Sequence, residues 1–186
     1  NCCLFDIGSI LRGGFEMSNV RYTEPKPVLS ALQVVGDITL VATAQQFGGF
    51  TLAELDKALL PYVLKSWKTA HDKYIELGLS EERAAEQSDK DVTRELEQGF
   101  QSLELKLNTV PCSRGDFAFT TISFGQWNLK DYAPFERKWL SKINTVMLQV
   151  RRNGPGPHNS PVVFPKLVYL NDETQLAAAQ YSTALI

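Results

Sequence analysis

Three thiols are the side chains of this chain best suited to nucleophilic or redox chemistry: Cys2, Cys3 and Cys112. An odd number of cysteines, two of them adjacent, makes a poor disulfide framework. Cys2 and Cys3 lie in a short apolar run over residues 1–7, which predicts a β-strand. Because successive residues of a strand point to opposite faces, we expect these two thiols to lie on different faces of a sheet.

Other reactive constellations are weak or absent in the sequence. Its two histidines, His71 and His158, belong to no CxxC or HxxxH spacing, so no metal site is predicted. The GxGxxG, GxxxxGK(S/T), GxSxG and HExxH motifs are also missing. The residues alone therefore indicate an α/β domain with an unusual cysteine pair, and they leave its chemistry open.

Composition limits the partners that this chain can have. The 186 residues are 44% hydrophobic and 22% charged, which suits a single domain with a buried core. A net charge of -2 and a pI of about 5.7 do not favour duplex nucleic acid as a partner. No apolar run reaches the roughly 18 residues of a membrane span, and no signal-peptide layout opens the chain. We expect a cytoplasmic protein without membrane contact.

Hydrophobic periodicity predicts alternating strands and helices along the chain. The expected elements are a strand at 1–7, a helical turn at 9–14, a polar connection at 15–27, helices at 28–47, 51–77 and 80–107, a strand at 117–124, a helix at 132–152, a strand at 162–169 and a helix at 173–185. Thr51 and Glu54 form a capping-box pattern, which would start the second long helix at Thr51. Pro165 restricts the last strand to an edge or a bulge.

This order of elements is typical of an α/β protein with a mainly parallel sheet. Three strands do not complete a barrel, and a parallel sheet needs cover on both faces. We therefore expect residues 1–186 to be a single piece of a larger domain. Its parts would be a strand and turn at 1–14, long helices at 28–107, and a strand-helix-strand-helix segment at 117–186.

Six sequence blocks, in this order, resemble the anaerobic (class III) ribonucleoside-triphosphate reductases, which are glycyl radical enzymes. They are Asn1-Cys2-Cys3-Leu4, Pro25-Lys26, Ala44-Gln45-Gln46-Phe47-Gly48-Gly49, Phe100-Gln101-Ser102-Leu103 with Asn108-Thr109, Phe119-Thr120-Thr121-Ile122-Ser123-Phe124-Gly125, and Val163-Phe164-Pro165-Lys166-Leu167-Val168. Each block is weakly specific, whereas six in order at similar spacing are a strong signal. The resemblance implies an N-terminal-half fragment: the first strands of a ten-stranded α/β barrel, with long helices at a dimer and effector interface.

The resemblance also implies an activity and the cofactors that it needs. The family reduces ribonucleoside triphosphates to deoxyribonucleoside triphosphates with a glycyl radical that generates a cysteine thiyl radical. Formate is a possible reductant, and a radical-SAM activase installs the glycyl radical. The glycyl radical residue, the thiyl hairpin and the zinc-binding cysteines would all lie outside this chain, so the chain alone is expected to be inactive.

Cys2 aligns with the reducing-side cysteine of that family, which makes it the candidate catalytic residue. Without the resemblance, a small core side chain is the simpler interpretation of Cys2. Cys3 is expected to pack in the core. Cys112 lies in a Pro-Cys-Ser-Arg-Gly loop before a strand, and we expect it to be noncatalytic, because the thiyl cysteine of the family comes later than this chain ends.

The family binds a dNTP or ATP effector where long helices of a homodimer meet. Lys26 matches a lysine of this site, and Lys68 roughly matches another. Thr23 aligns with an acidic residue of the family, to which Glu24 lies close, and Asp37 stands where the family often has glutamine. Lysines offer point charges to a triphosphate, whereas the simpler interpretation of Lys26 and Lys68 is a solvated surface lysine. Two alternatives stay open: another glycyl radical enzyme of the formate-lyase type, and a noncatalytic nucleotide-binding regulatory module.

Overall fold

The computed structural model describes residues 2–17, 19–46, 48–111, 115–125, 129–154, 160 and 162–171. In chain order its elements are β1 (Cys3–Phe5), α1 (Ile7–Gly13), β2 (Phe15–Met17), β3 (Val20–Tyr22), α2 (Val28–Ala44), β4 (Phe50–Leu52), α3 (Leu55–Glu76), α4 (Glu81–Thr109), β5 (Thr120–Gly125), the 3-10 turn η1 (Leu129–Asp131), α5 (Pro134–Asn153) and β6 (Lys166–Leu170). Strands and helices are interspersed along the chain, as the sequence predicts.

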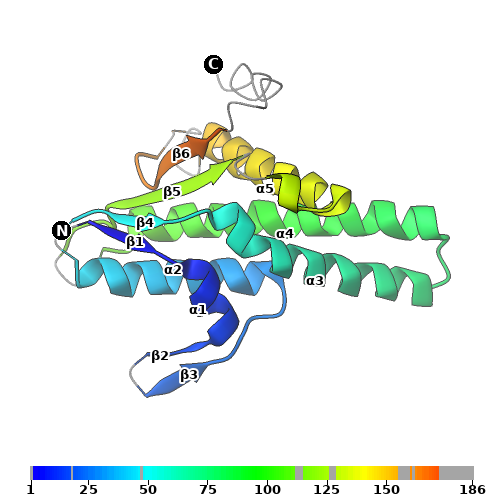
Figure 1. Cartoon of the computed structure of the whole chain (residues 1–186), viewed down its shortest axis with the longest axis horizontal. Coiled ribbons are helices and arrows are strands. Elements are labelled where there is room, and N and C mark those ends of the chain that lie inside the picture. The colour runs from blue at the N-terminus through cyan, green and yellow to red at the C-terminus, as the bar shows by residue number, and fades with distance from the viewer. Residues whose placement is uncertain are drawn as a thin grey trace.

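Four strands form one parallel sheet in the order β1-β4-β5-β6 (Figure 1). Leu4 is aligned with Thr51 and Thr121, and Thr121 in turn with Lys166, so these four residues form one row across the sheet. The prediction of an α/β protein with a parallel sheet is confirmed. In the described part of the chain β6 is an edge strand that begins directly after Pro165, as a strand beside proline should be.

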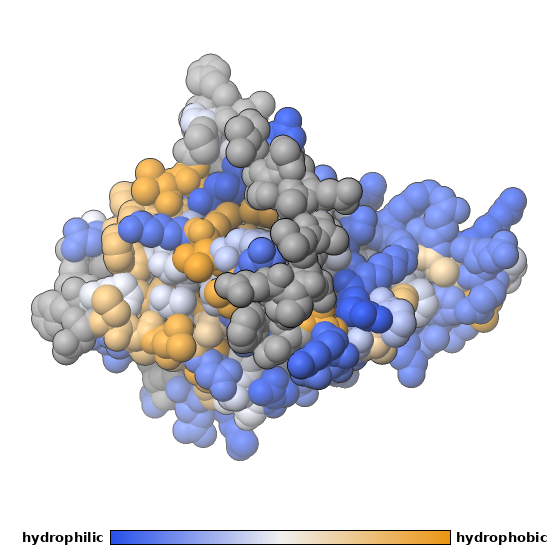
Figure 2. Space-filling view, turned by 45° about the horizontal axis from the view of Figure 1, so that its top comes forward, coloured by the Kyte–Doolittle hydropathy of each residue, from blue (hydrophilic) through white to orange (hydrophobic). Residues whose placement is uncertain are grey.

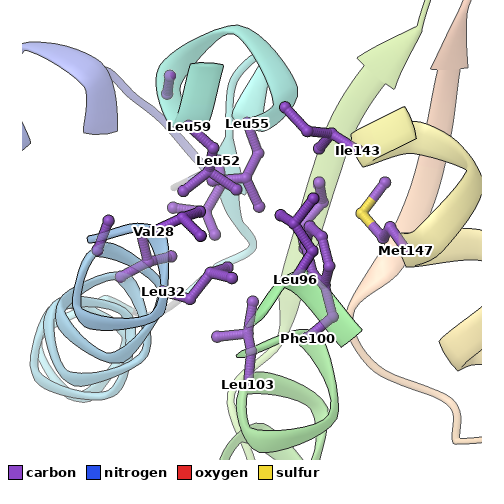
Figure 3. Packing of buried hydrophobic residues seen from close by; sticks show 14 of the residues in the cluster. Val28, Leu32, Leu52, Leu55, Leu59, Leu96, Phe100, Leu103, Ile143 and Met147 are labelled. Atoms are coloured by element: carbon purple, nitrogen blue, oxygen red, sulfur yellow. The ribbon is translucent and has the colours of Figure 1, made fainter. Parts of the chain in front are cut away.

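The helices lie against one face of this sheet and enclose the core (Figure 1). Figure 3 shows apolar side chains from α2, β4, α3, α4 and α5 converging on a common centre. Ten of them are labelled there: Val28, Leu32, Leu52, Leu55, Leu59, Leu96, Phe100, Leu103, Ile143 and Met147. Their i, i+3, i+4 spacing on the helices is the periodicity that predicted these helices.

Helix α1 begins at Ile7, two residues earlier than expected, and ends at Gly13, before Gly14. The Asp6 carboxylate caps it by accepting hydrogen bonds from the backbone N–H of Ser9, at 3.1 Å, and from the Ser9 hydroxyl, at 2.6 Å. Gly14 has a φ of 68°, and a Cβ there would lie 2.4 Å from the carbonyl oxygen of Tyr22. A glycine is therefore required where the chain turns into the hairpin of β2 and β3.

Two predictions about this first half are wrong. Thr51 does not cap a helix but lies in β4, because Phe50 and Leu52 are buried on the core face while the strand pairs with both β1 and β5. Helix α3 therefore begins at Leu55, with Glu54 at its N-cap. Residues 15–27 are not only a connection, since β2 and β3 form an antiparallel hairpin in which Phe15 stacks on Tyr22. The predicted helix at 173–185 lies outside the described residues.

Candidate functional site

One face of the sheet carries no helix in the described part of the chain. Side chains alternate along β1, where Cys3 and Phe5 pack against the core and Leu4 is 75% exposed. In the same way, Phe119, directly before β5, and Val168, in β6, are substantially exposed. Figure 2 shows hydrophobic residues gathered over the strand end of the molecule, whereas the projecting end of α3 and α4 is mainly hydrophilic. We call this helix-free side of the sheet the open face.

Cys2 lies at the N-terminal end of the open face. Its side chain is exposed, whereas that of Cys3 packs against the core, so the prediction that the two thiols point to opposite faces is confirmed. Gly49, the residue directly before β4, accepts a hydrogen bond at its carbonyl from the Cys3 N–H at 2.9 Å. A Cβ on Gly49 would lie 3.8 Å from the Cys2 sulfur and 3.2 Å from the Phe119 ring. The Phe119 ring therefore packs closely over the bare backbone of Gly49 beside the thiol, and we call this position without a side chain the Gly49 gap.

An aromatic and cationic group borders the same end of the open face. The rings of Phe119 and Phe164 meet edge to face, with centroids 5.1 Å apart. The ammonium of Lys166 lies over the Phe119 ring at 4.9 Å from its centroid. A positive charge and two aromatic rings thus lie at the beginning of β5 and β6, next to the Gly49 gap.

At the C-terminal end of the open face, the strands form the floor of a hollow of about 670 Å³. Its lining includes apolar side chains and hydroxyl groups from all four strands: Leu4, Thr51, Thr121, Ser123, Val168 and Leu170, with Glu54 and Asn171 at its edges. The carboxyl ends of parallel strands are the usual place for a ligand in α/β sheets. A second hollow of about 430 Å³ adjoins it and shares Leu4, Ala53 and Glu54.

A buried carboxylate fixes the floor of this hollow. Asp56, in the first turn of α3, is 1% exposed and accepts hydrogen bonds from the backbone N–H groups of Lys57 and Gly125, both at 3.0 Å. Burial raises the pKa of Asp56, while these two N–H groups and the Asn144 amide oppose that rise. Asp56 thereby ties α3 to the end of β5.

The predicted effector residues divide into two places. Glu24 forms an ion pair with Lys65 of α3 at 2.7 Å, and this hydrogen bond lowers the pKa of Glu24. Thr23 and Lys26 are exposed beside it in sequence, and Lys68 is exposed one helical turn after Lys65. Burial, helped by the Glu24 charge, raises the pKa of Tyr62 to about 12 beneath Lys65. Residues 23–26 with Lys65 and Lys68 form what we call the basic cluster.

Asp37 does not join the basic cluster. It pairs with Lys106 of α4 at 2.6 Å. Asp37 lies nine residues after Val28, or about 14 Å along α2 at 1.5 Å per residue, and Val28 is the residue held beside α3 by its N–H bond to Ser66. The structure therefore separates the predicted effector residues along α2.

Sequence reasoning missed Lys65, Glu54, Asp56 and Ser123. Of these four, Asp56 is the residue that the sequence could have indicated, because an acid stands there among the apolar residues of the buried helix face. The others depend on partners far away in sequence. Cys112 lies outside the described residues.

The described part of the chain offers neither a metal-binding cluster nor a membrane-spanning helix. No group of three or more His, Cys, Asp or Glu side chains there could hold a metal ion. Among the helices that the structure describes, none combines the length and apolarity of a bilayer span.

Comparison with known proteins identifies a family for nearly the whole chain. The family described as anaerobic ribonucleoside-triphosphate reductase matches residues 1–184. The reductase of that name from Enterobacteria phage T4 is 32% identical over 180 residues, which cover 93% of this chain and 27% of the phage protein. The Escherichia coli (strain K12) protein of the same name is 29% identical over 170 residues, covering 91% of this chain and 22% of its own length. The chain thus spans about a quarter of the length of these relatives.

Proposed function

This chain belongs to the anaerobic ribonucleoside-triphosphate reductase family, and we propose that it supplies the reducing-side thiol and part of an effector site to such a reductase. The activity proposed is the reduction of ribonucleoside triphosphates to deoxyribonucleoside triphosphates by glycyl and thiyl radical chemistry. The observation that carries this proposal is the position of Cys2, an exposed thiol on the open face beside the Gly49 gap.

A thiol in that position has a defined task in the proposed reaction. Loss of the ribose 2′-hydroxyl leaves an oxidised radical, which must receive electrons and hydrogen from the side opposite to the thiyl residue. Cys2 is free of the core and can approach a ribose, whereas Cys3 cannot turn toward it. Formate is the proposed reductant, with Cys2 assisting. The glycyl radical, its radical-SAM activase and a zinc site belong to the proposed whole enzyme.

The open face supports a place for this sheet in a barrel. On this face Leu4 is 75% and Val168 44% exposed, which is unfavourable for apolar side chains in water. Further strands beside β1 and β6 would continue the parallel sheet and bring cover to this face. We propose that these four strands are part of the first half of a ten-stranded α/β barrel.

Surface features of α2 support a homodimer with nucleotide control. The helix is rich in apolar residues and leaves Val41 40% exposed, with Val34 and Leu40 half-buried. The basic cluster lies where α2 begins beside α3. We propose that a dNTP or ATP effector binds there, with its phosphates near Lys26 and Lys68, at a contact between two copies.

Thermal shift with nucleotides tests the effector part of the proposal on the chain itself. A ligand at a hundred times its Kd stabilises the folded state by about 2.7 kcal/mol, so dNTPs should raise Tm measurably. Lys26→Gln and Lys68→Gln should reduce this rise, whereas Lys130→Gln, an exposed lysine on η1, should not. A rise that is equal in all four proteins would contradict the proposed site.

Activity tests the reductase part. Within a complete reductase polypeptide, Cys2→Ser should abolish deoxyribonucleotide formation while leaving the dNTP thermal shift intact. The chain alone, given activase, formate and anaerobic conditions, should form none. Product from the isolated chain that disappears on Cys112→Ser would instead make Cys112 the radical residue. A noncatalytic regulatory module would bind nucleotide without any product in either case.

A further inference from the structure

Lys166 is the one cationic side chain in the four strands of the described sheet. It is aligned with Thr121, in the row across the sheet that also contains Leu4 and Thr51. Neighbouring residues of such a row point to the same face of a parallel sheet, and the other three members of this row line the open face. Lys166, which is exposed, therefore brings the positive charge of these strands to the open face.

The Cys2 thiol belongs to the preceding row of the same face. The register of β1, β4 and β5 extends one residue toward their N-terminal ends, so that Cys2, Gly49 and Phe119 lie side by side. A Cβ on Gly49 would lie 3.8 Å from the Cys2 sulfur and 3.2 Å from the nearest carbons of the Phe119 ring. Only the Gly49 gap therefore separates the thiol from the aromatic ring.

The Lys166 side chain reaches back from its own row to the row of the thiol. Its ammonium lies over the Phe119 ring, 4.9 Å from the centroid, where the electron-rich face attracts a cation. The edge-to-face contact with Phe164, at 5.1 Å between centroids, supports this ring from the other side. One ring thus has the ammonium over its face and the Cys2 thiol across the Gly49 gap.

The charge of Lys166 is not neutralised by any acid that the structure describes. Its contact there is with an aromatic ring, and it takes part in no ion pair with a described residue. Five other lysines of the described chain each pair with a carboxylate: Lys57, Lys65, Lys90, Lys106 and Lys138. Lys166 therefore keeps its charge available for an anion from outside the chain.

We propose that Lys166 is a binding residue for formate, whose carboxylate it holds on the open face beside the Cys2 thiol. This inference rests on the proposed function, which supplies formate as the reductant. One ammonium matches the single charge of a monocarboxylate, whereas a triphosphate calls for several cations. The two oxygens of formate lie opposite its C–H bond. With both oxygens turned toward Lys166, that bond points away from the ammonium and toward the row of the thiol.

Nuclear magnetic resonance titration of the full chain with sodium formate tests this, with the Gly49 and Thr121 amides as reporters. Sodium chloride keeps the ionic strength at about 0.1 M, where charges more than about 10 Å apart are largely screened. Loss of a hydrogen bond between two charged groups should raise the Kd of formate about tenfold in Lys166→Gln. Lys166→Arg, which keeps the charge, should restore most of the affinity. Lys130→Gln, at an exposed lysine on η1, should leave the Kd unchanged.

A second readout tests whether the bound formate lies beside the thiol. In a Cys112→Ser background, formate next to Cys2 should slow the reaction of this thiol with N-ethylmaleimide, because it covers the sulfur. This reagent is uncharged, so the charge of Lys166 does not attract it. At a formate concentration equal to the Kd, half of the molecules are occupied, and the rate should fall to about half. At the same concentration the slowing should nearly vanish in Lys166→Gln.

The outcomes separate this inference from the proposed function. Lys166 is exposed, so its variants should fold, and a formate Kd that is equal in wild type and Lys166→Gln overturns the inference. So does the absence of any formate-dependent shift in the two reporter amides. A loss of ATP affinity in Lys166→Gln without a change for formate would assign this lysine to phosphates instead, which also overturns it.

The proposed function is judged by a different measurement, the formation of deoxyribonucleotide by a complete reductase polypeptide and its loss on Cys2→Ser. That result can support the function even where formate does not bind at Lys166. Conversely, formate binding that depends on Lys166, in a protein whose complete polypeptide never forms deoxyribonucleotide, would leave the binding residue in place while the reductase proposal fails.

Discussion

The guanidinium of Arg151 donates a hydrogen bond from Nε to the carboxylate of Glu104 at 2.6 Å, joining α5 to α4 inside the protein. Arg151 also donates from Nη1 to the Val162 carbonyl at 3.3 Å, and Asn108 of α4 donates to the Phe164 carbonyl at 2.7 Å. These contacts attach the segment before β6 to the helices. Arg151 and Asn108 therefore hold the segment that leads into the edge strand β6, and Glu104 holds Arg151 in place.

Removing the arginine should be costly. Glu104 is 4% exposed in its side chain, and burial already raises its pKa against the effect of Arg151. Arg151→Met would leave a buried carboxylate without its cation and should lower the free energy of unfolding by about 3–5 kcal/mol at pH 7. Urea denaturation measures this. Lys90→Met, which breaks the exposed pair with Glu86, is the control and should cost about 0.5 kcal/mol or less.

Gly125 should tolerate no side chain. Its φ is 140°, and a Cβ would lie 2.3 Å from the Leu170 carbonyl oxygen, so the backbones of β5 and β6 would have to separate. Gly125→Ala should therefore lower the free energy of unfolding by about 3 kcal/mol. Gly78→Ala is a matched control, because its φ is 86° but nothing lies within 4 Å. The control should cost only about 1–2 kcal/mol, and equal costs in the two variants would argue against the contact with Leu170.

Asp56 should make stability fall as pH rises. Burial raises its pKa in the folded state above the ordinary 3.8. The folded protein therefore holds the proton more tightly than the unfolded chain does. The resulting contribution of Asp56 to the free energy of unfolding is complete below about pH 3.8, and it is lost as pH rises through the folded pKa. The free energy of unfolding of the wild type minus that of Asp56→Asn, measured in urea from pH 3.5 upward, should decline over that window. A difference that is flat or increases with pH would show that Asp56 does not titrate this way.

The sequence was sufficient for elements whose signal is local, and insufficient for contacts between distant residues. Helix α5 was predicted from the spacing of Trp139, Ile143 and Val146, all of which are buried. Strand β4 is only three residues long, and the local capping pattern at Thr51 was misleading because pairing with β1 and β5 outweighs it. The bond from Glu54 to Ser123 spans 69 residues, so no local pattern could reveal it.

The two N-terminal thiols should differ sharply in reactivity. Cys2 is exposed, whereas Cys3 is half-buried and packs against the core. A thiol reagent must reach the sulfur, so Cys2 should react in a fast phase and Cys3 only slowly. The measurement is the rate of reaction with Ellman's reagent in a Cys112→Ser background, where Cys2 and Cys3 are the remaining cysteines.

Two further variants assign the phases to residues. Adding Cys2→Ser should remove the fast phase, and adding Cys3→Ser should leave it unchanged. Bulk at Gly49 should slow Cys2 specifically, because a Cβ there would lie 3.8 Å from its sulfur and press on the Phe119 ring. Gly49→Val should therefore slow the fast phase, whereas Gly13→Val, at a position with nothing within 4 Å, should not. A fast phase that survives Cys2→Ser would place the accessible thiol at Cys3 and remove the structural basis for Cys2 as the reducing-side residue.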